Sequence, residues 1–274
     1  MDTSSAASTA RQTGREAKHS TTLGLAIRLG LVSYGVVHVL VAWLALQLAW
    51  GGSSGEASEH GALRQLAEQP FGGVLMWTVG VGFAALVVWQ LIEAAIGHTE
   101  YDGWARTGHR AASAGKVALF GVLGYASIKL AVGAAGGKSA DSRTAQLMAA
   151  PGGRWLVALV GLAVIGYGIG MLTRAATRSF TDKLTARGEA SDLGTAAVWL
   201  GCAGYGGKAV AAAVVGLLFV WAAISFDPDQ AGGLDDALRT VLEQPFGPYL
   251  LTVLAIGIGC YGAFCFVWAR HLRR

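Results

Sequence analysis

The sequence is short of charge, proline and cysteine. Only 14% of its 274 residues are charged, against about 25% in ordinary soluble domains, which is too little for a water-facing surface. Three cysteines do not make a secreted disulfide scaffold, and forty glycines with only five prolines do not make a low-complexity chain. Apolar residues are abundant instead, at 53% with a mean hydropathy of +0.48. The composition predicts a polytopic membrane protein and excludes a nucleic-acid-binding module and a cytosolic enzyme.

Six apolar stretches are long enough to cross a bilayer. A helix rises about 1.5 Å per residue, so about 20 residues span a hydrocarbon core of about 30 Å. Because lipid offers no hydrogen-bond partner to the backbone, these spans must be helical. Four stretches are nearly free of charge, and two are interrupted by lysines. The expected spans are Leu29–Gly55, Phe71–Ile92, Ala111–Ala135, Trp155–Thr173, Leu193–Phe226 and Phe246–Ala269.

Basic residues are unequally divided between the two sides that alternating connections define. Thirteen lysines and arginines lie in the N-terminal segment, the second and fourth connections and the C-terminus, and five lie on the opposite side. Because cytoplasmic loops are enriched in lysine and arginine, we expect a multi-pass protein of the bacterial cytoplasmic membrane with both termini inside. Residues 51–70, 136–152 and 227–245 are then outside. Residues 1–22 lack an apolar core and are expected to form a disordered cytoplasmic tail.

The strongest pattern is an internal repeat. Residues 62–72 read ALRQLAEQPFG and residues 237–247 read ALRTVLEQPFG, with eight of eleven positions identical. A weaker copy at residues 146–152 precedes the fourth expected span. Each copy predicts a short outer helix that ends at a proline. Two spans and one such helix form a unit that occurs three times in one orientation, about an axis along the membrane normal.

The expected fold is therefore an all-α polytopic membrane protein with six transmembrane helices, built as three parallel two-helix repeats with pseudo-threefold symmetry. The repeats are expected at residues 23–100, 101–180 and 181–274. Aligning the odd-numbered spans places Tyr34, Lys116 and Lys208 at one repeat position, each four residues after a glycine or alanine. Small residues let membrane helices approach closely, so this stripe is expected to face protein.

Pro-Phe-Gly turns at Pro70 and Pro245 and a Gly-Tyr-x-x-Lys opening at Gly204, Tyr205 and Lys208 give the chain a family resemblance. It resembles the actinobacterial membrane proteins of the domain of unknown function 1206 family over about residues 24–272. The resemblance implies three tandem two-helix repeats and supplies no activity. The first two repeats depart from the opening pattern, which counts against a role that needs three equivalent basic groups.

The two intramembrane lysines are the main functional candidates. A charge at the bilayer centre costs at least about 2.5–3.5 kcal/mol, so Lys116 and Lys208 are expected to face an interior site. The alternative is that each lysine extends its apolar stem to reach the inner surface. Tyr34 and His38 of the first repeat are expected to complete the site, which would bind an anionic or polar small molecule.

Glu93, Arg174 and Tyr205 are secondary polar candidates. Glu93 is the only acid within an expected span, and it either pairs with a lysine or with Arg174, or stays hydrated at the inner interface. The three cysteines lie in apolar spans without metal or redox spacing and are expected to be inert packing residues.

No cofactor or metal is expected. A haem between helices takes two axial ligands, and His38 is the only histidine within a span. The connection at residues 98–109 carries His98 and His109, but their spacing matches no zinc pattern.

No Ser-His-Asp, HExxH or P-loop pattern is present, so the chain is not expected to be an enzyme. The leading hypothesis is transport or binding of an anionic or polar solute between the repeats. The alternative is a non-catalytic membrane scaffold, or a subunit that binds lipid or a partner. The bilayer is the expected environment, an anionic small molecule or anionic lipid is the expected ligand, and no nucleic acid is expected. Convergence of positions 34, 116 and 208 on one cavity would favour the first hypothesis.

Overall fold

Six long helices make up most of the part of the chain that the structure describes. The computed structural model describes residues 21–51, 55–96, 103–133, 152–181, 192–225 and 233–271. Each long helix is apolar enough to cross a membrane, which confirms an all-α, multi-pass fold. The long helices are α2 (Thr21–Ala49), α4 (Gly72–Ile96), α5 (Gly103–Ala131), α7 (Gly153–Thr177), α9 (Asp192–Ser225) and α11 (Gly247–Arg270).

The first span differs from its predicted bounds. Helix α2 is already present at Thr21, where the described residues begin, eight residues before the expected start, and it ends at Ala49 rather than Gly55. The end is fixed by Gly51, whose φ of 73° is a left-handed conformation that terminates the helix. The early start shows that the helix continues past Arg28, the charge that set the predicted boundary.

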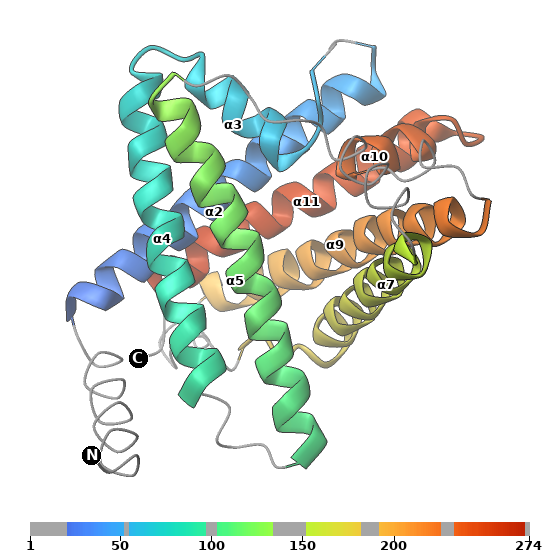
Figure 1. The fold of residues 1–274 in the computed structure, drawn as a ribbon. Coiled ribbons are helices and arrows are strands. Elements are labelled where there is room, and N and C mark those ends of the chain that lie inside the picture. Colours follow the sequence, from blue (N-terminus) through green and yellow to red (C-terminus); the bar gives the residue numbers. More distant parts are fainter. Residues whose placement is uncertain are drawn as a thin grey trace.

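Two short helices lie at the same end of the molecule (Figure 1). They are α3 (Glu59–Ala67) and α10 (Leu234–Leu242), and each ends before the duplicated Glu-Gln-Pro-Phe-Gly segment, as predicted. The Asp235 carboxylate in α10 accepts a hydrogen bond from the backbone N–H of Ala57, just before α3, at 2.7 Å. The outer segments of the first and third repeats are thereby joined. The weaker copy at residues 146–151 lies outside the described residues.

The backbone carries the threefold repeat. Phe71, Gly152 and Phe246 all have a left-handed φ, of 65°, 75° and 62°. Each stands directly after a proline and directly before the first residue of an even-numbered span. This conformation is unfavourable for a phenylalanine and ordinary for a glycine. Because the same unusual turn starts α4, α7 and α11, these three helices are equivalent members of the repeat.

Glycines set the distance between helices. Gly124 lies beside Gly80 between α5 and α4, and Gly216 lies beside Gly161 between α9 and α7. Gly80 and Gly161 each stand nine residues after the left-handed residue, so the two interfaces are repeat equivalents. Between α2 and α11, a Cβ on Gly35 would lie 2.9 Å from the carbonyl oxygen of Gly262. Close backbone approach is how membrane helices gain packing energy without a hydrophobic driving force.

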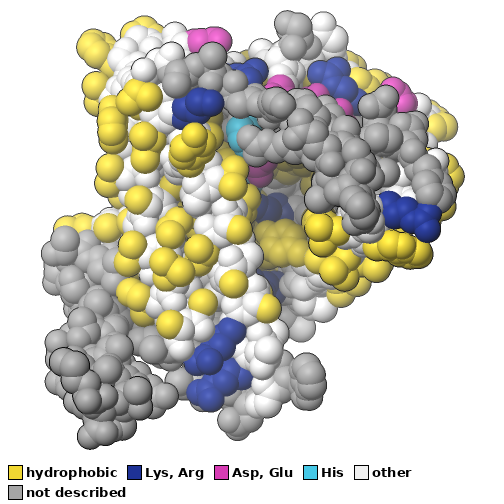
Figure 2. Space-filling view, in the orientation of Figure 1, with side chains coloured by type: hydrophobic (Ala, Val, Ile, Leu, Met, Phe, Trp, Pro, Cys, Tyr) yellow, Lys and Arg dark blue, Asp and Glu magenta, His cyan; other side chains and the backbone are white. Residues whose placement is uncertain are grey.

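The helices follow one another around an incomplete ring. Packed neighbours run from α5 to α4, α2, α11, α9 and α7, whereas α5 and α7 share no packed interface in the described part of the chain. Within the first repeat α2 packs against α4, and within the third repeat α9 packs against α11. The two helices of the second repeat, α5 and α7, do not pack against each other in the described part of the chain. Figure 2 shows the result as a hollow between the α4–α5 pair and the α7–α9 pair, with basic side chains inside it.

Candidate functional site

The candidate site lies at mid-depth, where α2, α9 and α11 meet. Lys208 is sixteen residues from the start of α9 and seventeen from its end, so about 24 Å of helix separates it from either end. Tyr34 and His38 occupy consecutive turns near the middle of α2. Tyr261 comes from α11, one turn after Gly257. All four residues lie inside helices that are long and apolar enough to span a membrane, at least nine residues from the helix ends.

Lys208 turns inward and bonds to two neutral groups. Its Nζ donates to the Tyr34 hydroxyl at 2.9 Å and lies 2.8 Å from His38 Nε2. Tyr34 and His38 are buried, and Lys208 is half-buried. Among the residues that the structure describes, no carboxylate forms an ion pair with Lys208. The extension to the inner surface that was left open for this lysine is therefore not what is observed.

The histidine tautomer follows from its partners. His38 Nδ1 lies 2.9 Å from the backbone carbonyl oxygen of Tyr34. A carbonyl only accepts, so Nδ1 carries the hydrogen, and the neutral ring leaves its Nε2 lone pair for Lys208. The Lys208 ammonium has three hydrogens, of which Tyr34 and His38 take two. The third hydrogen, and the hydrogen of the Tyr34 hydroxyl, remain for an acceptor.

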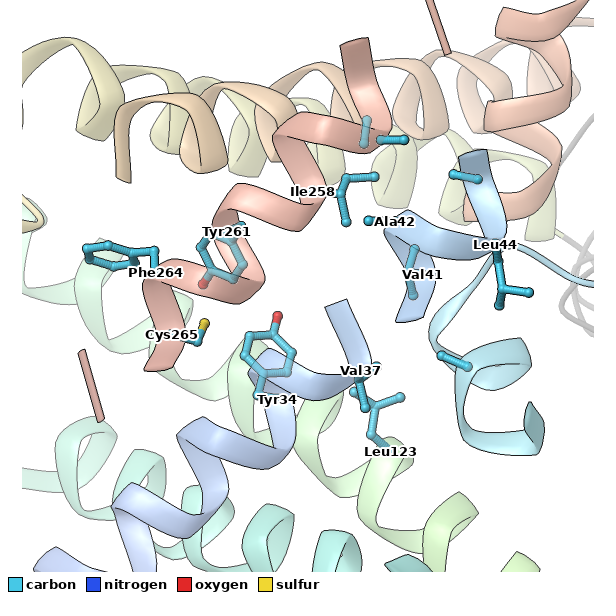
Figure 3. Packing of buried hydrophobic residues seen from close by; sticks show 14 of the residues in the cluster. Tyr34, Val37, Val41, Ala42, Leu44, Leu123, Ile258, Tyr261, Phe264 and Cys265 are labelled. Carbon is cyan, nitrogen blue, oxygen red and sulfur yellow. The ribbon is translucent and has the colours of Figure 1, made fainter. Parts of the chain in front are cut away.

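Aromatic rings surround the ammonium. Lys208 Nζ lies 4.4 Å from the ring centroid of Tyr261 and 5.1 Å from that of Tyr34, both within cation–π range. Tyr34 also meets Phe120 edge-on, with ring centroids 5.2 Å apart. Figure 3 shows Tyr34 and Tyr261 reaching toward one another from α2 and α11. The electron-rich face of the Tyr261 ring stabilises the cation in place of a carboxylate, and Tyr34 contributes through its hydroxyl oxygen.

Two glycines bring α9 close enough to α11 for these contacts. A Cβ on Gly204, one turn before Lys208, would lie 2.6 Å from the backbone of Tyr261. Gly207 approaches Gly257 with similar closeness. Gly204 thus has the packing role expected of the small residue on this stripe, and Lys208 lies over the Tyr261 ring.

Lys116 does not join this cluster. It is half-buried on α5, one turn before Phe120, and the described residues show no hydrogen bond between it and Tyr34 or Lys208. Its electrostatic neighbours are Arg174 of α7 and Glu93 of α4. We call Lys116, Arg174 and Glu93 the second charged cluster, because the latter two lie within electrostatic range of Lys116. Of positions 34, 116 and 208, the structure brings Tyr34 and Lys208 into contact and leaves Lys116 apart from them.

Tyr205 is buried beside the site rather than in it. Its ring stacks on Phe180 with centroids 5.2 Å apart and meets Tyr261 edge-on at 5.3 Å. Tyr205 therefore supports Tyr261 from behind.

His98 lies outside the described residues, as does the side chain of His109.

Tyr261 was missed by the sequence analysis. The first repeat has Leu86 at the same position, but the second has Tyr167, so the recurring tyrosine is visible when the even-numbered spans are aligned and not in the alignment of the odd-numbered spans. A tyrosine in the middle of a span, away from the interfaces that tyrosines favour, is the signal that identifies it.

A family model matches most of the chain. The model described as Domain of Unknown Function (DUF1206) matches three tandem segments, residues 29–97, 111–178 and 203–271. The chain belongs to this family. It is also 28% identical over 240 residues to the uncharacterized protein YxxB of Bacillus subtilis (strain 168), which covers 86% of each chain. No solved structure matches the chain. The three matched segments confirm the three tandem repeats and the family resemblance.

Proposed function

We propose that this membrane protein binds, and moves across the bilayer, a small anion that docks at Lys208. The proposal rests on one observation: the hydrogen-bond partners of the Lys208 ammonium, Tyr34 and His38, are both neutral. A cation without a carboxylate at mid-depth is costly, and such groups mark ligand or ion paths in membrane proteins. The hydrogens left on Lys208 and Tyr34 are both donors, so the ligand they fit is an acceptor. An anion supplies the acceptor and the missing negative charge together.

The opening between α5 and α7 gives this ligand a route. Tyr167 of α7 and Glu59 of α3 are within electrostatic range of Lys208, and Tyr167 is 38% exposed. Lys116 and Arg174 lie on the two helices that flank the opening. Cations along a path raise the local concentration of an anion and its association rate. Lys208 thus serves as the docking point and the second cluster as the approach.

The test is a binding screen on the purified full chain in lipid nanodiscs, with benzoate, inorganic phosphate and phosphatidylglycerol as probes. Replacing Lys208 by Met removes a charged hydrogen-bond donor worth about 1.5–3 kcal/mol, so affinity should fall about 10- to 150-fold. Lys116→Met is the matched control because it stands at the same repeat position. It should slow association with a smaller change in affinity.

An affinity unchanged by Lys208→Met would contradict the proposal. It would favour a non-catalytic scaffold or partner-binding subunit. One observation favours that alternative: Phe71 and Phe246, in the outer turns, are more than three-quarters exposed. Binding of phosphatidylglycerol alone would identify a lipid ligand instead of a solute.

A further inference from the structure

The Lys208–His38 contact holds one proton between two bases. With Nζ and Nε2 2.8 Å apart, one hydrogen lies between them, and His38 Nδ1 keeps its own hydrogen on the Tyr34 carbonyl. A second proton on Nε2 would place two cations in direct contact at mid-membrane. While the site has no ligand, it carries a single positive charge.

We infer that each anion binds together with one proton, taken up at His38 Nε2. This inference rests on the proposed function. The anion accepts the third hydrogen of Lys208 and draws the ammonium away from the imidazole, which breaks the N–H···Nε2 bond. Nε2 then accepts a proton from water. The anion and the proton add no net charge, so the site stays at one positive charge before and after binding. In a low-dielectric interior, adding an anion and a proton together costs less free energy than adding either charge alone.

The groups that face the pair from the surrounding helices do not offer another proton acceptor. Helix α2 contributes Tyr34, α9 contributes Tyr205, and α11 contributes Tyr261 and Cys265. Helices α4 and α5 present the uncharged rings of Phe83 and Phe120. Tyr167 and Glu59 lie farther out, within electrostatic range of Lys208, and Arg174, Glu93 and Lys116 belong to the second cluster. Histidine is the side chain among them that ordinarily titrates near neutral pH.

The surroundings also define the anion. One ammonium balances one negative charge, and the described residues place no arginine fork within hydrogen-bonding distance of Lys208 to hold a doubly charged phosphate. The Tyr34 and Tyr261 rings next to the ammonium, with Phe120 packed against Tyr34, offer apolar contacts to a body attached to the charge. The chemistry therefore selects a monocarboxylate with an aromatic or aliphatic body.

The experiment measures benzoate affinity of the full chain in nanodiscs between about pH 6 and pH 8, with proton uptake recorded in weakly buffered solution. Coupling of one proton predicts that the Kd rises about tenfold per pH unit above the titration of His38. It also predicts uptake of about one proton per benzoate bound. Benzoate itself is ionised throughout this range, so it does not produce the slope.

Two variants assign the proton. His38→Gln keeps an acceptor for Lys208 and cannot titrate, so benzoate binding should lose its pH dependence and its proton uptake. Glu93→Gln removes the carboxylate of the second cluster and should keep both the pH dependence and the proton uptake. Should His38→Gln fail to fold, the wild-type slope and proton count still decide the matter.

The possible failures are distinct. Benzoate binding with a flat pH profile and no proton uptake overturns proton coupling and leaves anion binding in place. A slope that survives in His38→Gln and disappears in Glu93→Gln moves the proton to Glu93 and overturns the assignment to His38. No benzoate binding at any pH, with phosphate and lipid also unbound, removes the proposed function and this inference together.

Discussion

Lys208 is stabilised by groups that carry no charge of their own. The Tyr34 hydroxyl accepts one of its hydrogens, the His38 ring accepts another, and the Tyr261 ring lies beneath the ammonium. Each interaction is stronger here than in water, because neither lipid nor packed protein screens it. The cost of the buried charge is thereby lowered without an ion pair that would neutralise it. A ligand still gains by supplying the negative charge.

A double-mutant cycle should reveal this coupling. Tyr34→Phe removes the hydroxyl that accepts from Lys208, and should lower the free energy of unfolding by about 1.5–3 kcal/mol. In a Lys208→Met background the same change should cost much less, because the charged donor is gone, giving a coupling energy of about 1–3 kcal/mol. Denaturant unfolding in detergent measures both values. Tyr125→Phe, on an exposed tyrosine of α5, is the control and should be near neutral. A cycle that closes to zero would contradict the observed bond.

The sequence predicted three members of this cluster for a physical reason. Tyr34, His38 and Lys208 lie on the stripe that starts with a small residue, and such a stripe faces a neighbouring helix in a membrane. The sequence predicts which residues share one face of a helix, because the helical period is fixed. It does not predict which other helix packs against that face. Tyr261 was missed, and Lys116 was placed with Lys208, because both depend on how separate helices pack.

At the scale of the element, one glycine controls the geometry of the site. A Cβ at Gly204 would lie 2.6 Å from the Tyr261 backbone, so α9 and α11 must separate to accept it. Gly206, two residues along the same helix, has open space at the position of its Cβ. Gly204 and Gly206 are both glycines at nearly the same depth in α9. They differ in that a Cβ on Gly204 would meet α11, whereas a Cβ on Gly206 would meet no other helix.

Gly204→Ala should therefore destabilise the protein by about 1–3 kcal/mol through overpacking. It should also weaken ligand binding, because Lys208 would move off the Tyr261 ring. Gly206→Ala should be neutral or stabilising by up to about 1 kcal/mol, as alanine favours a helix. Thermal unfolding and benzoate affinity of the two variants give the comparison. Equal effects from both would show that α9 and α11 are not held at this distance.

Element boundaries were predictable where turn chemistry was specific. The duplicated Glu-Gln-Pro-Phe-Gly segment set the starts of α4 and α11 to within one residue of those expected. The start of α2 was misplaced because a single arginine was taken as a boundary, although arginine favours helices and its long stem reaches the interface. A charged residue marks where the membrane-embedded part of a helix ends, but the helix itself continues past it.

At the scale of the whole molecule, the threefold repeat explains the order in which the helices pack. It does not explain why α5 and α7 are left without a packed interface. Equivalent glycine pairs join α4 to α5 and α7 to α9, so successive repeats are fastened in the same way. On α5 and α7, Gly115, Gly121, Gly166 and Gly170 have nothing within 4 Å of a Cβ built on them. Within the described part of the chain, these four glycines therefore take no part in a close helix contact. A sequence repeat predicts equivalent surfaces, and it does not state which of them meet.

The orientation of the whole molecule is the last prediction, and it follows from the thirteen basic residues on one side and five on the other. In a chain with Cys202, Cys260 and Cys265 replaced by serine or alanine, single cysteines at the exposed repeat equivalents Glu68 and Glu243 should react with an impermeant thiol reagent on intact cells. Because helix α7 returns the chain to the basic side, Ser179→Cys should react only after the membrane is permeabilised. If Glu68→Cys and Glu243→Cys label from opposite sides, the repeats are not parallel and the six-span fold is wrong. If all three positions show the reverse pattern, the fold stands and the termini lie outside.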